Sequence, residues 1–262
     1  MKKKSLIIGG VTGGVIILAL VGLILAGYFA SFGPFSFLFN NYLMTKEGNA
    51  EKYSVAEVIP DENSSLKGKK IAFLGSSVTY GYAALGESFA DFLEAKDGVI
   101  KYKEAVSGTT LADINNQSYV SRFSNFSTDL DIDLFVLQLS TNDASKGAEL
   151  GDISSSDKTT SFGAINYIYQ KVEEQYNCPV LIYTNPYYQN ETYQNMVSLA
   201  EELCKDENDN LYLLNLYYDE EFNSITSEER KLYMFDNIHP TRCGYQNWWL
   251  PEFEEIIAAI CQ

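Results

Sequence analysis

The sequence has 262 residues, enough for one domain or for one domain with an additional segment. Hydrophobic residues make up 46% and charged residues 21%, as in packed globular proteins, which excludes disorder along the whole chain. Acidic residues outnumber basic ones by 35 to 19, giving a net charge of −16. This charge excludes nucleic acid as a partner, because a phosphate backbone requires a positive surface.

The first element along the chain is an apolar segment, residues 6–30, without a charged side chain. As a helix it would extend roughly 37 Å, and the hydrocarbon core of a bilayer is about 30 Å thick. Three lysines at residues 2–4 precede it, and the positive-inside rule places them in the cytoplasm. We therefore expect a cytoplasmic tail at residues 1–5, an uncleaved transmembrane anchor at 6–30 and an extracellular location for the remainder. A cleaved signal peptide is the alternative, although its apolar region normally spans only about 7–15 residues.

Aromatic and polar residues follow the apolar segment. The aromatic residues are typical of the outer membrane interface, and they are Phe32, Phe35, Phe37, Phe39 and Tyr42. The polar stretch from Thr45 to Lys70 contains Pro60 and a run of turn-forming residues. It predicts a juxtamembrane linker, so that residues 31–68 hold a domain of residues 69–262 away from the membrane.

Short apolar runs alternate with helical patterns in the remainder of the chain. Strands are expected at residues 70–75, 101–106, 133–139, 178–183 and 211–216, and helices at residues 87–95, 161–176 and 192–205. This alternation predicts parallel βαβ units and therefore an α/β fold, a three-layer α/β/α sandwich with a parallel, flavodoxin-like sheet of about five strands. Ligands bind at the carboxyl ends of the strands in such a sheet, so the loops after the strands are the expected place for a site.

Those loops, together with a turn before the last helix, carry the groups that acyl transfer needs. Ser77 can act as nucleophile, and His239, the only histidine, as its base. Asp236 lies three residues before the histidine and can hold the imidazole in the correct tautomer. Gly108 and Asn142 offer a backbone N–H and an amide to an oxyanion. Each residue alone has an ordinary structural explanation, such as a turn or a helix cap, but their joint placement favours a catalytic site.

The same residues lie in four sequence blocks that resemble those of the SGNH hydrolases, the GDSL esterase/lipase superfamily. The blocks cover residues 75–81, 106–109, 140–143 and 236–240, and the last one matches Asp-x-x-His-Pro at every letter. The resemblance implies that Ser77 is the nucleophile and that Asp236 and His239 complete the triad. It also implies an oxyanion hole formed by Ser77 through its own N–H, Gly108 and Asn142.

Two positions depart from the family pattern. Ser76 stands where the first block usually has aspartate, and Ser140 where the third usually has glycine. Neither position performs the chemistry, so the departures concern loop geometry and subfamily. An α/β-hydrolase fits less well, because its G-x-S-x-G motif requires a glycine where this chain has Thr79.

The resemblance implies an ester or acyl-group substrate and no cofactor. With one histidine and no C-x-x-C pair, no metal site is expected either. An outward-facing, membrane-tethered domain favours a serine esterase that removes O-acyl, above all O-acetyl, groups from carbohydrate. A polysaccharide O-acyltransferase with the same acyl-serine and a non-catalytic glycan-binding module are the alternatives. Four tyrosines at and after the fourth strand either stack against sugars or pack in the core, namely Tyr183, Tyr187, Tyr188 and Tyr193.

The four cysteines allow three full pairings. Cys178 begins a predicted strand and Cys204 ends the helix that returns from it, so a bridge between them is compatible with the topology. Cys243 and Cys261 flank the last helix, about 25 Å apart, and cannot meet. Four unpaired thiols are the alternative.

Overall fold

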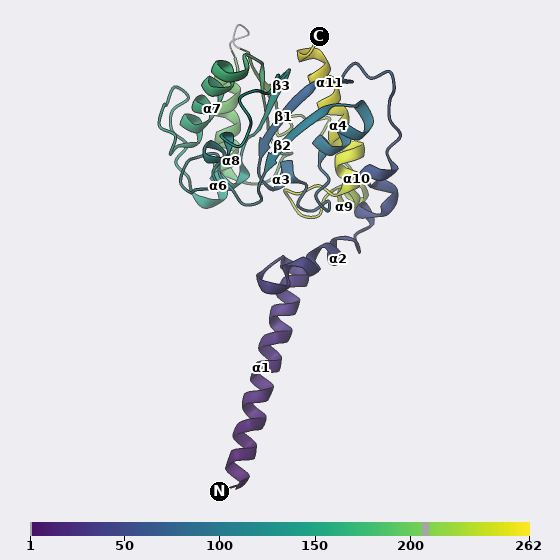
Figure 1. Cartoon of the computed structure of the whole chain (residues 1–262), viewed down its shortest axis with the longest axis vertical. Helices are drawn as coiled ribbons and strands as arrows, with labels where there is room; N and C mark the ends of the chain where they lie inside the picture. The colour runs from purple at the N-terminus through teal and green to yellow at the C-terminus, as the bar shows by residue number, and fades with distance from the viewer. Residues whose placement is uncertain (1, 206–209) are drawn as a thin grey trace.

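The computed structural model describes residues 2–205 and 210–262, and side chains from Val15 onward. Met1 and the lysine side chains of the expected cytoplasmic tail lie outside the described part. Five parallel strands form one sheet in the order β2-β1-β3-β4-β5 (Figure 1). The strands are β1 (Lys70–Gly75), β2 (Ile100–Ala105), β3 (Leu134–Gln138), β4 (Val180–Tyr183) and β5 (Leu211–Leu214). The predicted parallel, flavodoxin-like sheet is therefore confirmed.

Helices cover both faces of the sheet and complete three layers (Figure 1). Ile71 and Phe73 of β1 face the core formed with α4 (Phe89–Asp97) and α11 (Leu250–Ile260). Ala72 and Leu74 face the opposite core, under α7 (Ser161–Tyr176) and α8 (Glu191–Leu203). Because both faces are covered, β1, β3 and β4 are almost continuously apolar.

The carboxyl ends of the strands lie along the lower edge of the domain in Figure 1. Short helices lie near these ends. They are α3 (Ser77–Tyr80), α5 (Tyr119–Phe123), α6 (Thr141–Lys146), α9 (Ser227–Tyr233) and α10 (Arg242–Gly244), and a π-helical turn (Tyr245–Trp249) leads into α11. The catalytic blocks of the sequence lie on this edge.

The N-terminal helix α1 (Lys2–Ala30) extends away from this same edge (Figure 1). The chain turns at Ser31 (φ 53°), passes through a 3₁₀ segment (Gly33–Leu38) and forms α2 (Phe39–Leu43). Among the described residues, no single helix is long and apolar enough to cross a bilayer. The stretches 15–30 and 33–43, bent by 45°, meet that requirement only as a pair. The transmembrane anchor therefore stays a prediction.

The segment expected to be a juxtamembrane linker differs from a free spacer, because residues 45–68 pack on the domain. Asn49 is only 2% exposed and donates to the carbonyl oxygens of Leu43 at 3.1 Å and Ala83 at 2.8 Å. Its side-chain oxygen accepts from the backbone N–H of Arg242 at 3.0 Å. Leu66 is buried in the core that the sheet forms with α4 and α11. A polar residue of the kind that indicated a linker, Asn49, thus forms hydrogen bonds with backbone groups far away in the sequence.

All four cysteines are free, so the Cys178–Cys204 bridge is not formed. Burial raises the pKa of both Cys178 and Cys204 to about 12. Both thiols are therefore protonated at physiological pH.

Candidate active site

The first block forms a tight turn between β1 and α3. A side chain at Gly75 would place its Cβ 1.7 Å from the Thr79 hydroxyl oxygen, so the turn requires glycine there. Ser77 is the first residue of α3 and is 7% exposed. The turn therefore holds the hydroxyl of Ser77 in a fixed place at the carboxyl edge of the sheet.

Ser77, His239 and Asp236 form a continuous chain of hydrogen bonds. The Nε2 atom of His239 lies 2.8 Å from the Ser77 Oγ, and its Nδ1 lies 2.8 Å from Asp236 Oδ2. The other oxygen of Asp236 accepts from the N–H groups of Ile238 at 2.7 Å and His239 at 2.8 Å. The structure thus brings together the three predicted members in the arrangement of nucleophile, base and orienting carboxylate.

The electrostatics of Asp236 suit its role. Desolvation raises the pKa of its carboxyl, but the hydrogen bond and charge of His239 and the two backbone N–H groups outweigh that effect. The net result is a pKa below the ordinary value. Asp236 is therefore ionised at neutral pH and can stabilise the imidazolium that forms when Ser77 loses its proton.

The predicted oxyanion donors lie on the neighbouring loops. Gly108 follows β2 with φ +79°, a conformation that favours glycine, and Asn142 lies in the first turn of α6 after β3. The Nδ2 of Asn142 donates to the Ser76 Oγ at 3.2 Å. In the described part of the chain the N–H groups of Ser77 and Gly108 have no hydrogen-bond partner. Both remain available to an oxyanion.

The two departures from the family pattern have structural roles. The Ser76 hydroxyl accepts the hydrogen bond from Asn142 and so orients the amide beside the nucleophile. The Ser140 hydroxyl accepts from the N–H groups of Asn142 at 3.2 Å and Asp143 at 3.3 Å, which makes Ser140 the N-cap of α6. Asn142 is therefore not the helix cap that the sequence allowed, and its side chain instead donates to Ser76 beside the nucleophile.

Two buried polar residues that the sequence analysis missed hold the loops in place. Gln138, at the end of β3, accepts from the Ser76 N–H and from the Thr79 hydroxyl, both at 2.8 Å. The guanidinium of Arg122 donates to the Gly75 carbonyl at 2.8 Å and to Thr109 at 2.9 Å. Gln138 could have been noticed, because a glutamine stands out at the end of an otherwise apolar strand. No sequence pattern indicates the role of Arg122.

Asp143 ties the second block to the third. It is fully buried and accepts from the N–H groups of Leu111 at 2.8 Å and Ala112 at 3.0 Å and from the Ser161 hydroxyl at 2.9 Å. Burial raises the pKa of this carboxyl. Its bonds fix the loop that carries Gly108 relative to α6.

Three of the four tyrosines considered for sugar stacking pack in the core. Tyr183 and Tyr193 are fully buried, and Tyr188 is 9% exposed. Only Tyr187, at 53% exposure, presents a ring to solvent.

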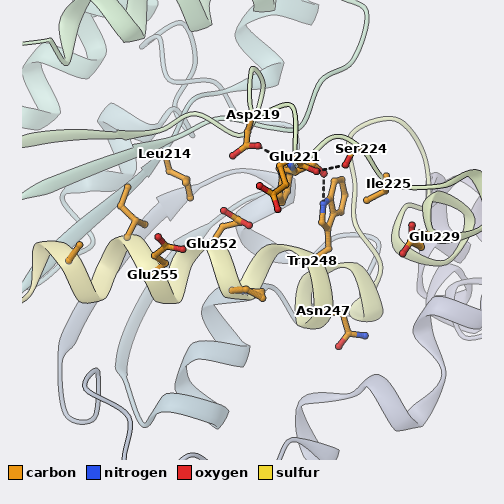
Figure 2. A pocket seen from close by; sticks show the side chains of 14 residues that line it. Leu214, Asp219, Glu221, Ser224, Ile225, Glu229, Asn247, Trp248, Glu252 and Glu255 are labelled. Carbon is orange, nitrogen blue, oxygen red and sulfur yellow. Dashed lines mark hydrogen bonds between the residues drawn. The ribbon is translucent and has the colours of Figure 1, made fainter.

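A cavity of about 930 Å³ lies apart from the triad, between α11 and residues 219–225 (Figure 2). Carboxylates surround it, and they belong to Asp219, Glu221, Glu229, Glu252 and Glu255. No three potential metal ligands converge there or elsewhere in residues 2–205 and 210–262. This cavity contains no member of the predicted catalytic site.

Comparison with known proteins identifies the family of the chain. The family model described as the GDSL-like lipase/acylhydrolase family matches residues 73–246. No curated protein sequence matches the chain significantly.

Several solved structures share the fold. A protein from Lactobacillus plantarum has 18% identity and a TM-score of 0.59, covering 74% of this chain and 98% of its own. A protein assigned to the G-D-S-L family of lipolytic proteins, from Desulfitobacterium hafniense, has 17% identity and a TM-score of 0.57, covering 72% and 99%. A family two carbohydrate esterase from Clostridium thermocellum, in complex with cellohexaose, has 18% identity and a TM-score of 0.51, covering 76% and 66%.

Proposed function

Because the chain belongs to the GDSL-like lipase/acylhydrolase family, we propose that this SGNH-type esterase is anchored in the membrane and acts outside the cell. We propose that it hydrolyses O-acyl, chiefly O-acetyl, esters on carbohydrate. The observation that carries the esterase chemistry is the unbroken chain from Ser77 through His239 to Asp236, with 2.8 Å at both steps.

The reaction follows from the positions of these groups. The Ser77 oxygen attacks the ester carbonyl carbon while its proton passes to Nε2 of His239. The negative oxygen of the tetrahedral intermediate meets the N–H groups of Ser77 and Gly108 and the amide of Asn142. The intermediate expels the alcohol, which takes the proton from His239, and leaves the acyl group on Ser77. Water then attacks the acyl-enzyme with His239 again as base, which releases the acid and restores Ser77.

Two observations support the substrate and the location. One of the structures with the same fold is a carbohydrate esterase holding cellohexaose. The apolar residues 6–30 follow three lysines, a pattern typical of an anchor with its N-terminus in the cytoplasm. The intact triad argues against the non-catalytic glycan-binding module. An O-acyltransferase would share every step up to the acyl-enzyme and differ only in the acceptor.

The test is turnover by the full-length protein in detergent micelles. We expect release of p-nitrophenol from p-nitrophenyl acetate and covalent labelling by a fluorophosphonate, with both lost in Ser77→Ala. An absence of turnover and labelling in the wild type would contradict the proposal. A burst of p-nitrophenol followed by slow turnover in water would favour the transferase if added glycan accelerates the turnover. Water would then be a poor acceptor and the glycan a good one.

A further inference from the structure

The segment between α1 and the domain lies against the catalytic loops. The Phe39 ring of α2 stacks on Tyr82 with the ring centroids 5.2 Å apart, and it meets Phe235 edge-on at 5.9 Å. Tyr42 also contacts Phe235, at 6.0 Å. Phe39 is 3% exposed and Leu43 is fully buried in this small core. The N-terminal segment thus packs directly on the loops that carry Tyr82 and Phe235.

The residues that α2 contacts, Tyr82 and Phe235, are themselves in contact with His239. The Tyr82 ring lies 5.3 Å from the imidazole ring of His239. Phe235 directly precedes Asp236, and its N–H donates to the His239 carbonyl at 2.9 Å. A residue of α2 therefore shares its packing partners with the catalytic base.

A cavity of about 470 Å³ opens at this junction, a size typical of small-molecule sites. Three segments form its walls: the N-terminal segment, the loop after the nucleophile, and the end of β2 with the loop that precedes Gly108. The first segment contributes Ser31, Phe39 and Asn40, the second includes Tyr80 and Tyr82, and the third includes Ser107.

The walls suit a neutral, polar ring. The lining includes the aromatic residues Phe39, Tyr80 and Tyr82 and the hydrogen-bonding residues Asn40 and Ser107. None of the described residues that line the cavity is charged, so an ionic ligand would find no partner there. Sugar rings combine apolar C–H faces with hydroxyl groups and fit this combination.

One residue of the cavity wall, Tyr82, contacts the catalytic base. His239 gives the alcohol its proton, so the alcohol must lie beside the imidazole. In an acylated carbohydrate the alcohol is the sugar itself.

On the basis of the proposed esterase function, we propose that this cavity binds the sugar that carries the scissile acyl group, and that this sugar belongs to a glycan held in the membrane surface. The second part rests on the wall formed by residues 31–40. Phe32 is 67% and Phe37 is 68% exposed on that short segment, as expected for rings at a bilayer interface. Rings placed in a bilayer interface would bring Ser31, Phe39 and Asn40, which line the cavity, close to the membrane surface.

The test fills the cavity from its N-terminal wall in the full-length protein, reconstituted in lipid nanodiscs. Asn40→Trp places an indole in the cavity, and Asn41→Trp is the matched control, since Asn41 is exposed and does not line the cavity. The substrates are octyl 6-O-acetylglucoside, which partitions into the bilayer, and ethyl acetate. We expect N40W to lower the ratio of kcat/KM for the glucoside over that for ethyl acetate about tenfold, and N41W to leave the ratio unchanged.

Three results decide between the parts of the proposal. An unchanged ratio in N40W, with Ser77 still labelled by a fluorophosphonate, would overturn the sugar site. Equal wild-type kcat/KM for octyl and methyl 6-O-acetylglucoside would overturn the membrane source, since only the octyl compound partitions into the bilayer. A wild-type protein that hydrolyses neither ethyl acetate nor the glucosides, and is not labelled, would overturn the proposed function itself.

Discussion

His239 is the only histidine in the chain, so no second imidazole can replace it as base. We expect His239→Ala to lower kcat about as strongly as Ser77→Ala, and the double variant to be hardly worse, because triad members act as a unit. Asp236→Asn should cost less than either, although still orders of magnitude, through loss of the correct tautomer. Steady-state kinetics on p-nitrophenyl acetate measures all four variants. Activity that survives in His239→Ala would show that another base takes the proton of Ser77.

Asn142 and Ser140 lie two positions apart but have different predicted roles. Asn142 is the oxyanion donor, and Ser140 is the N-cap of α6. Asn142→Ala should lower kcat by about 10² to 10³ by removing an oxyanion donor, with the melting temperature unchanged. Ser140→Ala is its matched control and should lower stability by about 1 kcal/mol, because the hydroxyl caps α6. Kinetics and thermal unfolding on both variants give the comparison. A drop in stability without loss of kcat in Asn142→Ala would contradict the oxyanion assignment.

From the sequence alone one could predict the three residues that the structure joins by hydrogen bonds, but not the residues that support them. Ser77, Asp236 and His239 lie in recognisable blocks after strands, and parallel strands bring such blocks to one edge. Gln138 and Arg122 act through contacts between loops that are distant in sequence, which no local pattern records.

Among the elements, the pairing of α4 with β2 depends on one partly buried carboxylate. Asp91 forms ion pairs with Lys101 and Lys103 of β2, both at 2.5 Å. Burial alone raises the pKa of Asp91, but the charge and hydrogen bonds of the two lysines outweigh it, and the net pKa lies below the ordinary value. The folded state therefore binds the proton less tightly than the unfolded state does.

The stabilisation by Asp91 is accordingly fully present above the unfolded-state pKa, about 3.9, and is lost as the pH falls from there through the folded-state pKa. We expect Asp91→Asn to be less stable than the wild type by about 1–3 kcal/mol near neutral pH. The difference should shrink as the pH falls below the unfolded-state pKa and disappear only once the pH lies below the lowered folded-state pKa. Urea unfolding at several pH values measures this. Asp131→Asn is the control, because its ion pair with Lys70 is exposed and should matter little. A difference that persists at low pH would show that Asp91 acts through packing, not charge.

The same elements show why some boundaries were predictable. The helix expected at residues 161–176 has those ends in the structure, with Thr160 as N-cap and Asn177 in a left-handed C-cap. The strand at β2 gave a weak signal because it is an edge strand whose lysines and Glu104 are only partly buried. The region at residues 45–68 has the composition of a linker, and its packing through Asn49 depends on partners such as Arg242, far away in the sequence.

For the whole molecule, we expect the full-length protein to remain in the membrane fraction after carbonate extraction, with its N-terminus intact. The reason is the length of the uncharged segment 6–30. N-terminal sequencing of the purified protein provides the measurement. A mature N-terminus near residues 27–31 would show a cleaved signal peptide, and the enzyme would then be secreted.

The packing of residues 31–68 on the domain also governs how far such an enzyme can reach. Phe29 near the end of α1 contacts Tyr42, which contacts Phe235, so the helix and the catalytic loop are joined by rings without a slack segment between them. An enzyme on a long tether searches a volume above the membrane, whereas this arrangement, with α1 in a bilayer, would fix one orientation and one height. With α1 in a bilayer, encounters would then depend on lateral diffusion of substrate within the surface. The rate at low substrate density would follow lipid fluidity, not the viscosity of the surrounding solution.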